Sequence, residues 1–254
     1  MTLVLATVLT AAVPAAADET CPSAALRATT QPTTRPGHAR HFAARYTALE
    51  RSLASGRYDV LMLGDSHVQL WPQAEAERAF GSTRILNAGI SGDRTGSLIH
   101  RLESRRTTIN ADGRRLETGV SGWENQRPRL VFLLVGGNDA LRGEPACAVV
   151  AGVEAVIQRI RALYPDARLL VSGLLPRGPR LDAFPAAADV NRLLRVVIDR
   201  QAPRVRFVDL GASLGCPAEA PCDLLRPPNH GHMTAEGYRR VSETLRAAVS
   251  DVVP

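Results

Sequence analysis

The chain has 254 residues, 45% of them hydrophobic, which is enough apolar content for one globular domain with a sizeable core. Its formal net charge is +6, and its positive charge comes from arginine because the sequence contains no lysine. The arginines are spread among acidic residues and aromatic residues make up only 4%, so the composition argues against nucleic-acid binding and indicates a solvated basic surface.

The chain begins with an apolar stretch from Leu3 to Ala17, which ends in three alanines before Asp18. This stretch is shorter than the roughly 20 residues that a membrane-spanning helix needs, so we expect no stable membrane span. Small residues at its end are typical of a signal-peptide cleavage site, although no Lys or Arg precedes it. We predict that residues 1–17 are a signal peptide and that the protein is secreted or periplasmic. A disordered tail or a mis-assigned start codon is the alternative.

Residues 18–37 are rich in Ala, Thr and Pro and are predicted to form either an extended amino-terminal arm or a linker. No later change in composition divides the chain, so residues 38–254 are predicted to form one domain.

The chain contains four cysteines, and an even number in an exported protein suggests disulfide bonds. Three pairings are possible with four cysteines. Cys216 and Cys222 are the closest in sequence and form the favoured local pair. Cys21 and Cys147 would then join the mature amino terminus to the body of the protein. Four unpaired thiols in a cytosolic protein are the alternative.

Short apolar runs alternate with helical patterns along the predicted domain. The clearest helical pattern covers Val149–Leu163, and a final helix is predicted from about Thr234 to Val249. Such alternation is typical of βαβ units, so we predict an α/β protein with a parallel sheet and helices on both faces. The polar stretch Arg105–Arg127 interrupts the alternation and is predicted to be a long loop. The predicted strands are Asp59–Leu63, Arg84–Asn87, Leu130–Val135, Arg168–Leu174 and Val205–Asp209.

The first predicted strand ends in Gly64-Asp65-Ser66, a tight turn that places a serine at the carboxyl end of a buried strand. Open α/β sheets bind their ligands at this edge. A serine there is a candidate nucleophile if an imidazole can take its proton and N–H groups can stabilise the oxyanion.

Three further segments supply those groups. The glycine-rich turn after the second strand contains Gly92, and the turn after the third strand contains Asn138. The segment before the last helix contains His232. With a strand order of 2-1-3-4-5, the three turns would lie side by side. We therefore predict an oxyanion hole formed by the N–H groups of Ser66 and Gly92 and the amide of Asn138, with an imidazole from the segment before the last helix as the base.

A resemblance to a known family is visible in five stretches of the sequence: GDSHVQLW, LNAGISGDRTGSLIHRLE, VFLLVGGND, AGVEAVIQRIRALYPDARLLVSGLLPRG and HMTAEGY. The chain resembles the SGNH (GDSL) hydrolases, and especially the bacterial relatives of the platelet-activating-factor acetylhydrolase catalytic subunits. The resemblance covers residues 59–245. It implies a three-layer α/β/α, flavodoxin-like fold with a five-stranded parallel sheet of order 2-1-3-4-5. It also implies ester hydrolysis without metal or cofactor, a lipid or carbohydrate ester as substrate, and the possibility of a homodimer. By the family pattern Ser66 would be the nucleophile and His232 the base, and Gly92 and Asn138 would complete the oxyanion hole.

One position departs from the family pattern. Relatives usually have Asp three residues before the catalytic histidine, and this chain has Asn229. An amide oxygen can accept from the imidazole Nδ1–H, but it does not stabilise an imidazolium as a carboxylate does; in serine proteases the same change lowers turnover about 10⁴-fold. Three interpretations stay open: Asn229 orients His232, Asp223 reaches it from the preceding loop, or Ser66 and His232 act as a dyad.

The predicted function is hydrolysis of a short acyl ester, acetyl first, of a carbohydrate or lipid alcohol through an acyl-enzyme. One alternative is an O-acetyltransferase in which a sugar hydroxyl resolves the intermediate. The other is a glycan-binding protein with weakened catalysis, for which Asn229 is the support.

Overall fold

The computed structural model describes residues 21–33, 43–81, 84–103, 106–109, 115–177, 186–216, 222–228 and 231–250. Its centre is a parallel sheet of five strands in the order β2-β1-β5-β6-β7. In chain order this is 2-1-3-4-5, so the predicted topology and fold class are confirmed. The strands are β1 (Val60–Gly64), β2 (Ile85–Gly89), β5 (Leu130–Leu134), β6 (Arg168–Ser172) and β7 (Val205–Val208).

Alternate residues of the strands face two separate hydrophobic cores, as the two-residue period of a strand requires. In β1, Leu61 and Leu63 pack into one core, whereas Val60 and Met62 pack into the other. Because both faces are covered, the central strands are apolar almost throughout. The register aligns Gly64 with Gly89 of β2 and Leu134 of β5, which brings the turns that follow these strands to one edge of the sheet.

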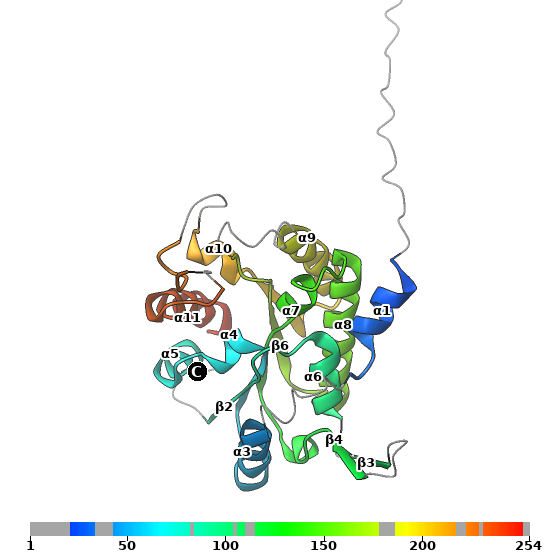
Figure 1. Cartoon of the computed structure of the whole chain (residues 1–254). Coiled ribbons are helices and arrows are strands. Elements are labelled where there is room, and N and C mark those ends of the chain that lie inside the picture. The colour runs from blue at the N-terminus through cyan, green and yellow to red at the C-terminus, as the bar shows by residue number, and fades with distance from the viewer. Residues whose placement is uncertain are drawn as a thin grey trace, which may run out of the picture.

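Helices form a layer on each face of the sheet (Figure 1). One layer contains α5 (Gln73–Phe80), α10 (Leu210–Leu214) and α11 (Ala235–Val249), whose buried residues share a core. The other contains α3 (Ala43–Ser55), α6 (Thr95–Leu102), α8 (Ala146–Leu163) and α9 (Ala186–Asp199). The last helix was predicted to begin at about Thr234, but it begins one residue later, at Ala235. Thr234 is instead the N-cap of α11, and its hydroxyl accepts from Gly237 N at 3.2 Å. In the part of the chain that the structure describes, no helix is long and apolar enough to cross a membrane.

The amino-terminal arm contains a helix, α1 (Ser23–Thr30), rather than only an extended segment. Figure 1 shows it lying against α8 on the outside of the helical layer. The disulfide Cys21–Cys147 joins the start of this arm to the start of α8. A second disulfide joins Cys216 to Cys222, so both favoured cysteine pairs are confirmed. The predicted signal peptide, residues 1–17, lies outside the described residues.

The stretch predicted to be a long loop, Arg105–Arg127, contains regular structure. Strands β3 (Arg106–Ile109) and β4 (Arg115–Thr118) form an antiparallel pair, and a 3₁₀ turn, η1 (Trp123–Asn125), follows. Trp123 is 1% exposed and belongs to the core on the α8 side of the sheet. The segment therefore contributes to the fold at its carboxyl-terminal end, which the polar composition concealed.

Candidate active site

The turn after β1 places Ser66 at the carboxyl edge of the sheet. Gly64 allows a close approach there, because a Cβ on this residue would lie 2.1 Å from the carbonyl oxygen of Leu134. Asp65 is the N-cap of the short helix α4 (Ser66–Gln69), and its Oδ1 accepts from His67 N at 3.0 Å. Ser66 is 7% exposed and starts this helix, where backbone N–H groups have no intrahelical partner.

His232 reaches this serine from the other end of the chain. Its Nε2 atom lies 2.8 Å from Ser66 Oγ, within hydrogen-bond distance. The segment around it is fixed by a β-bridge between Met233 and Leu225 and by the Thr234 cap of α11. The Tyr238 hydroxyl donates to the carbonyl oxygen of His67 at 2.9 Å, which joins α11 to the turn that carries Ser66. The structure thus brings the predicted nucleophile and base together.

Asn138 lies beside them in α7 (Gly137–Ala140), directly after β5. The turn into α7 requires a glycine, because Gly136 has φ +112°, in the left-handed region. The Asn138 Nδ2 atom donates to the carbonyl oxygen of Asp93 at 2.8 Å and to Asp65 Oδ2 at 3.3 Å. Both amide hydrogens therefore face acceptors, and the longer bond to Asp65 is the weaker of the two.

Gly92 lies in the turn between β2 and α6 and has φ +78°, again a conformation that favours glycine. The neighbouring Ser91 N donates to the Gln69 side chain at 2.6 Å, so this turn is joined directly to α4. The structure brings Gly92, Asn138 and Ser66 to one edge of the sheet, as the sequence predicted.

Burial sets the protonation of the histidines at this edge. It lowers the pKa of His232 from its ordinary value of 6.5, and the positive charges of Arg177 and then Arg226 lower it further. The His67 ring, with its centroid 5.3 Å from that of His232, is fully buried, and this burial lowers its pKa to about 3. Both imidazoles are therefore neutral near pH 7, and a neutral His232 can accept a proton from Ser66.

Asp65 titrates in the opposite direction. Its burial raises the pKa of the carboxyl to about 7, against the lowering effect of its hydrogen bond from His67 N. The carboxyl caps α4 and accepts from Asn138, so its contacts hold the turn in place.

The residue that would orient His232 is not identified by these contacts. Asn229 lies outside the described residues, as does His230. Asp223 is described and exposed, and within the described residues no hydrogen bond or ion pair joins its carboxylate to His232. The same part of the chain contains no cluster of His, Cys, Asp or Glu able to hold a metal ion.

Two buried contacts near the site were not predicted. In the first, the Asp139 carboxylate accepts from Thr95 N at 3.0 Å and so caps α6, a helix from another segment of the chain. The second contact is an ion pair between Asp93 and Arg101, both 0% exposed, with 2.6 Å between Arg101 Nε and Asp93 Oδ2. A signal for it exists in the sequence, because Arg101 follows the buried Leu98 by three residues and so shares the apolar face of its helix.

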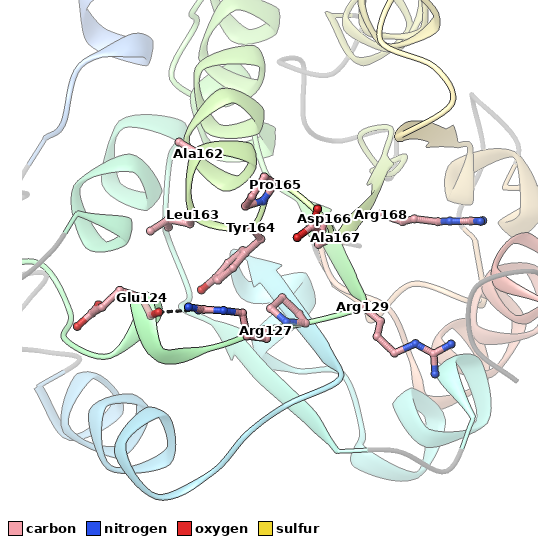
Figure 2. A pocket seen from close by; sticks show the side chains of 11 residues that line it. Glu124, Arg127, Arg129, Ala162, Leu163, Tyr164, Pro165, Asp166, Ala167 and Arg168 are labelled. Carbon is pink, nitrogen blue, oxygen red and sulfur yellow. Dashed lines mark hydrogen bonds between the residues drawn. The ribbon is translucent and has the colours of Figure 1, made fainter.

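The cavity of about 720 Å³ shown in Figure 2 is not part of this site. Its lining residues include Arg129 and Ala167, which immediately precede the amino ends of β5 and β6, whereas Ser66 lies at the carboxyl edge. Polar groups of the cavity bond within the protein: Arg127 donates to the Glu124 carbonyl oxygen at 2.7 Å, as Figure 2 shows, and Tyr164 donates to that of Trp123 at 3.0 Å.

The sequence and the fold are similar to those of known proteins. The model of the GDSL-like lipase/acylhydrolase family matches residues 52–240. Subunit alpha2 of the rat platelet-activating factor acetylhydrolase IB is 31% identical over 202 residues, which are 77% of each chain. Subunit alpha1 of the human protein is 34% identical over 153 residues, which are 59% of this chain and 58% of the relative.

Solved structures with the same fold include a GDSL-like lipase from Bacteroides thetaiotaomicron, with a TM-score of 0.60 and 15% identity over 86% of this chain and 100% of that one. A carbohydrate esterase of family 3 from Talaromyces cellulolyticus has a TM-score of 0.54 and 17% identity over 76% and 96% of the two chains. The chain belongs to the GDSL-like lipase/acylhydrolase family and is a serine ester hydrolase.

Proposed function

We propose that the protein hydrolyses short-chain acyl esters, acetyl esters first, of carbohydrate or lipid alcohols, with Ser66 as nucleophile and His232 as base. The single observation that carries this assignment is the 2.8 Å contact between His232 Nε2 and Ser66 Oγ at the carboxyl edge of the sheet. Neutral His232 takes the hydroxyl proton while Oγ bonds to the acyl carbon. The imidazolium then protonates the leaving alkoxide, and water releases the acid from the acyl-enzyme by the reverse steps.

The negative charge that develops on the acyl oxygen would be stabilised by N–H groups of Ser66 and Gly92 and by the Asn138 amide. The long bond between Asn138 Nδ2 and Asp65 Oδ2, 3.3 Å, is the one that the oxyanion would replace. The shorter bond to the Asp93 carbonyl oxygen would persist and hold the amide in place. Exchanging this long bond for a shorter one to the developing negative charge favours the transition state over the resting enzyme.

We further propose that Asn229 accepts from His232 Nδ1–H, with Asp223 as the alternative orienting group. The positive charges of Arg177 and Arg226 already disfavour the imidazolium, so an amide in place of a carboxylate leaves this charge without strong compensation. The protein is proposed to act outside the cytosol, which the two disulfides and the predicted signal peptide support.

The acetyl preference is proposed by analogy with the platelet-activating factor acetylhydrolase subunits. The carbohydrate alcohol is proposed by analogy with the carbohydrate esterase. The test is turnover of p-nitrophenyl acetate and of longer acyl esters by the wild type and by Ser66→Ala. Ser172→Ala is the matched control, because Ser172 is also buried at a strand's carboxyl end but bonds to its own chain neighbour, the Gly173 carbonyl oxygen.

We expect Ser66→Ala to lose activity, Ser172→Ala to keep it, and the acetyl ester to be hydrolysed fastest. Wild-type turnover no faster than that of Ser66→Ala would contradict hydrolysis and favour a glycan-binding protein. Acetyl transfer to an added glycan, faster than release of acetate, would favour the acetyltransferase. Asn229→Asp is expected to raise turnover, and an unchanged rate would show that this position does not limit the triad.

A further inference from the structure

The buried side chain of Arg101 joins two segments of the active site, the end of β1 and the turn that follows β2. It is 0% exposed, although it carries a full positive charge on helix α6. Its Nε atom donates to Asp93 Oδ2 at 2.6 Å, and its Nη2 atom donates to the carbonyl oxygen of Gly64 at 3.1 Å. One guanidinium thus bonds to the end of β1 and to the turn that follows β2.

The two acceptors are close in sequence to groups of the proposed oxyanion hole. Gly64 precedes Ser66 by two residues, and Asp93 directly follows Gly92. The carbonyl oxygen of Asp93 also accepts from Asn138 Nδ2 at 2.8 Å. Through these bonds Arg101 is connected to all three segments that carry the proposed oxyanion donors.

This connection is stiff for two physical reasons. A guanidinium is a planar fork with fixed angles between its N–H groups, so two acceptors bound by it are held at a defined separation. In addition, a buried charge that loses its carboxylate partner is costly, so the Asp93 turn is held against movement away from Arg101. Oxyanion donors depend on such precision, because they act only when about 2.7–3.1 Å from the developing charge.

We propose that Arg101 is a positioning residue that, through Asp93 and Gly64, sets the spacing of the oxyanion donors on Ser66, Gly92 and Asn138. It does not touch the substrate. The proposal rests on the proposed function, because it concerns how that same site is held.

The test uses Arg101→Lys and Asp93→Asn in the full-length protein. Lysine keeps the charge but lacks the fork, and asparagine keeps the shape but lacks the charge. Trp123→Phe is the matched control, because the Trp123 indole N–H donates to the backbone oxygen of Arg101 at 2.8 Å and is equally buried. That variant disturbs the same helix without removing the guanidinium bonds.

Two quantities are measured: kcat and KM for p-nitrophenyl acetate, and the ratio of its kcat to that of the corresponding thionoester. Sulfur is a weak hydrogen-bond acceptor, so an oxyanion hole favours the oxygen ester. The ratio compares two substrates on the same active fraction of enzyme, so partial unfolding does not change it.

We expect Arg101→Lys and Asp93→Asn to lower kcat by about 10- to 100-fold with little change in KM, since a displacement of about 1 Å can cost a factor of about 100. The oxygen-to-sulfur ratio should fall in both variants and stay at the wild-type value in Trp123→Phe. A wild-type ratio in either variant that retains a folded, active fraction would overturn the positioning role, as would an equal fall in the control. If neither variant folds, Arg101→Gln is measured in their place. An unchanged oxygen-to-sulfur ratio in Arg101→Gln would then show that Arg101 and Asp93 contribute to stability alone.

These outcomes are separate from a failure of the proposed function. If Ser66→Ala keeps full activity, the site itself is wrongly assigned. If Ser66→Ala is inactive and the ratio is unchanged in the Arg101 and Asp93 variants, only the positioning role fails.

Discussion

The Nε2 atom of His232 lies 2.8 Å from Oγ of Ser66, although 166 residues separate them in sequence. The contact depends on the sheet order, which puts the turn after β1 between the turns that follow β2 and β5 at the carboxyl edge. Helix α11 then carries the segment with His232 to that edge, and the hydrogen bond from Tyr238 to the His67 carbonyl oxygen joins the two elements at 2.9 Å. The same helix is anchored by Trp71, whose indole N–H donates to Ser242 at 3.2 Å.

Replacing Asn138 with alanine should impair the chemical step. Loss of one oxyanion donor lowers kcat by about 10²- to 10³-fold, so we expect a fall of this size in Asn138→Ala, with KM nearly unchanged. Steady-state kinetics with p-nitrophenyl acetate measure both quantities. Asn191→Ala is the control, because its amide oxygen accepts from Leu174 N at 2.6 Å and its Nδ2 donates to the Leu174 carbonyl oxygen, so this amide bonds to the backbone and is not a proposed oxyanion donor. A fall in kcat as large in the control would contradict the assignment.

The acid limb of the pH–activity profile should report His232. Burial and then Arg177 lower its pKa, so the free enzyme stays active below pH 6.5. Replacing Arg177 with glutamine removes a positive neighbour, which raises this pKa and moves the acid limb of kcat/KM to higher pH. Arg226→Gln should shift it in the same direction by a smaller amount. A limb that moves to lower pH, or does not move in either variant, would contradict the electrostatic account.

His67 should make the protein less stable as the pH falls. Its folded pKa of about 3 lies below its ordinary value of 6.5, so the unfolded chain binds a proton that the folded protein does not. Stability present above pH 6.5 is therefore lost toward pH 3, by about 1.4 kcal/mol for each pH unit between the two values. Asp65, with its pKa raised to about 7, has the opposite effect: its contribution is present below pH 3.8 and is lost as the pH rises through 7.

The comparison of His67→Gln with the wild type isolates this histidine, because Asp65 is present in both. Urea unfolding at several pH values between 7 and 4 gives the free energies. We expect the variant to lose less stability on acidification. The two plots of unfolding free energy against pH should therefore converge or cross as the pH falls. Parallel dependence on pH in the two proteins would show that His67 titrates equally in the folded and unfolded states.

The long-range disulfide should stabilise the protein more than the local one. Cys21 and Cys147 are 126 residues apart, and Cys216 and Cys222 are 6 apart. Loop-closure entropy predicts about 5 kcal/mol for the first and about 2 kcal/mol for the second. Urea unfolding of the two double serine variants measures the difference. A larger loss of unfolding free energy in the variant that lacks the Cys216–Cys222 disulfide would contradict the entropic explanation.

The arm that the Cys21–Cys147 disulfide joins to α8 also packs next to the site. The Thr95 hydroxyl lies 2.8 Å from the Thr29 carbonyl oxygen of the arm and 3.0 Å from Asp139 Oδ1. Asp139 adjoins Asn138 in α7, so the arm packs directly behind the oxyanion segment. This contact explains why a helix forms in a stretch whose Ala, Thr and Pro content suggested a linker: packing on α8 and a covalent bond stabilise it.

The sequence was sufficient to predict the sheet because fully buried parallel strands are apolar runs of defined length. The observed strands differ from the predicted ones by one or two residues at their ends, and Val205–Val208, for example, was predicted as Val205–Asp209. Ser66, Gly92 and Asn138 were predicted as site residues because each follows such a strand, and strand ends meet at one edge. His232 was predicted from its place in a segment that resembles the family.

The contacts that were missed depend on partners from distant segments. Helical spacing places Arg101 on the apolar face of α6, but only the three-dimensional structure shows that Asp93 is its buried partner. Asp139 likewise caps a helix from another segment. Local sequence rules therefore predicted elements and turns, whereas the buried polar network behind the site required the three-dimensional structure.

Covalent labelling with a fluorophosphonate, followed by peptide mapping, tests the central claim most directly, because it requires an activated nucleophile but no knowledge of the substrate. We predict a single modified residue, Ser66, with labelling abolished in Ser66→Ala and slowed strongly in His232→Ala. Modification of a different residue, or no modification of protein that is folded by circular dichroism, would contradict the assignment of Ser66 and His232 as nucleophile and base.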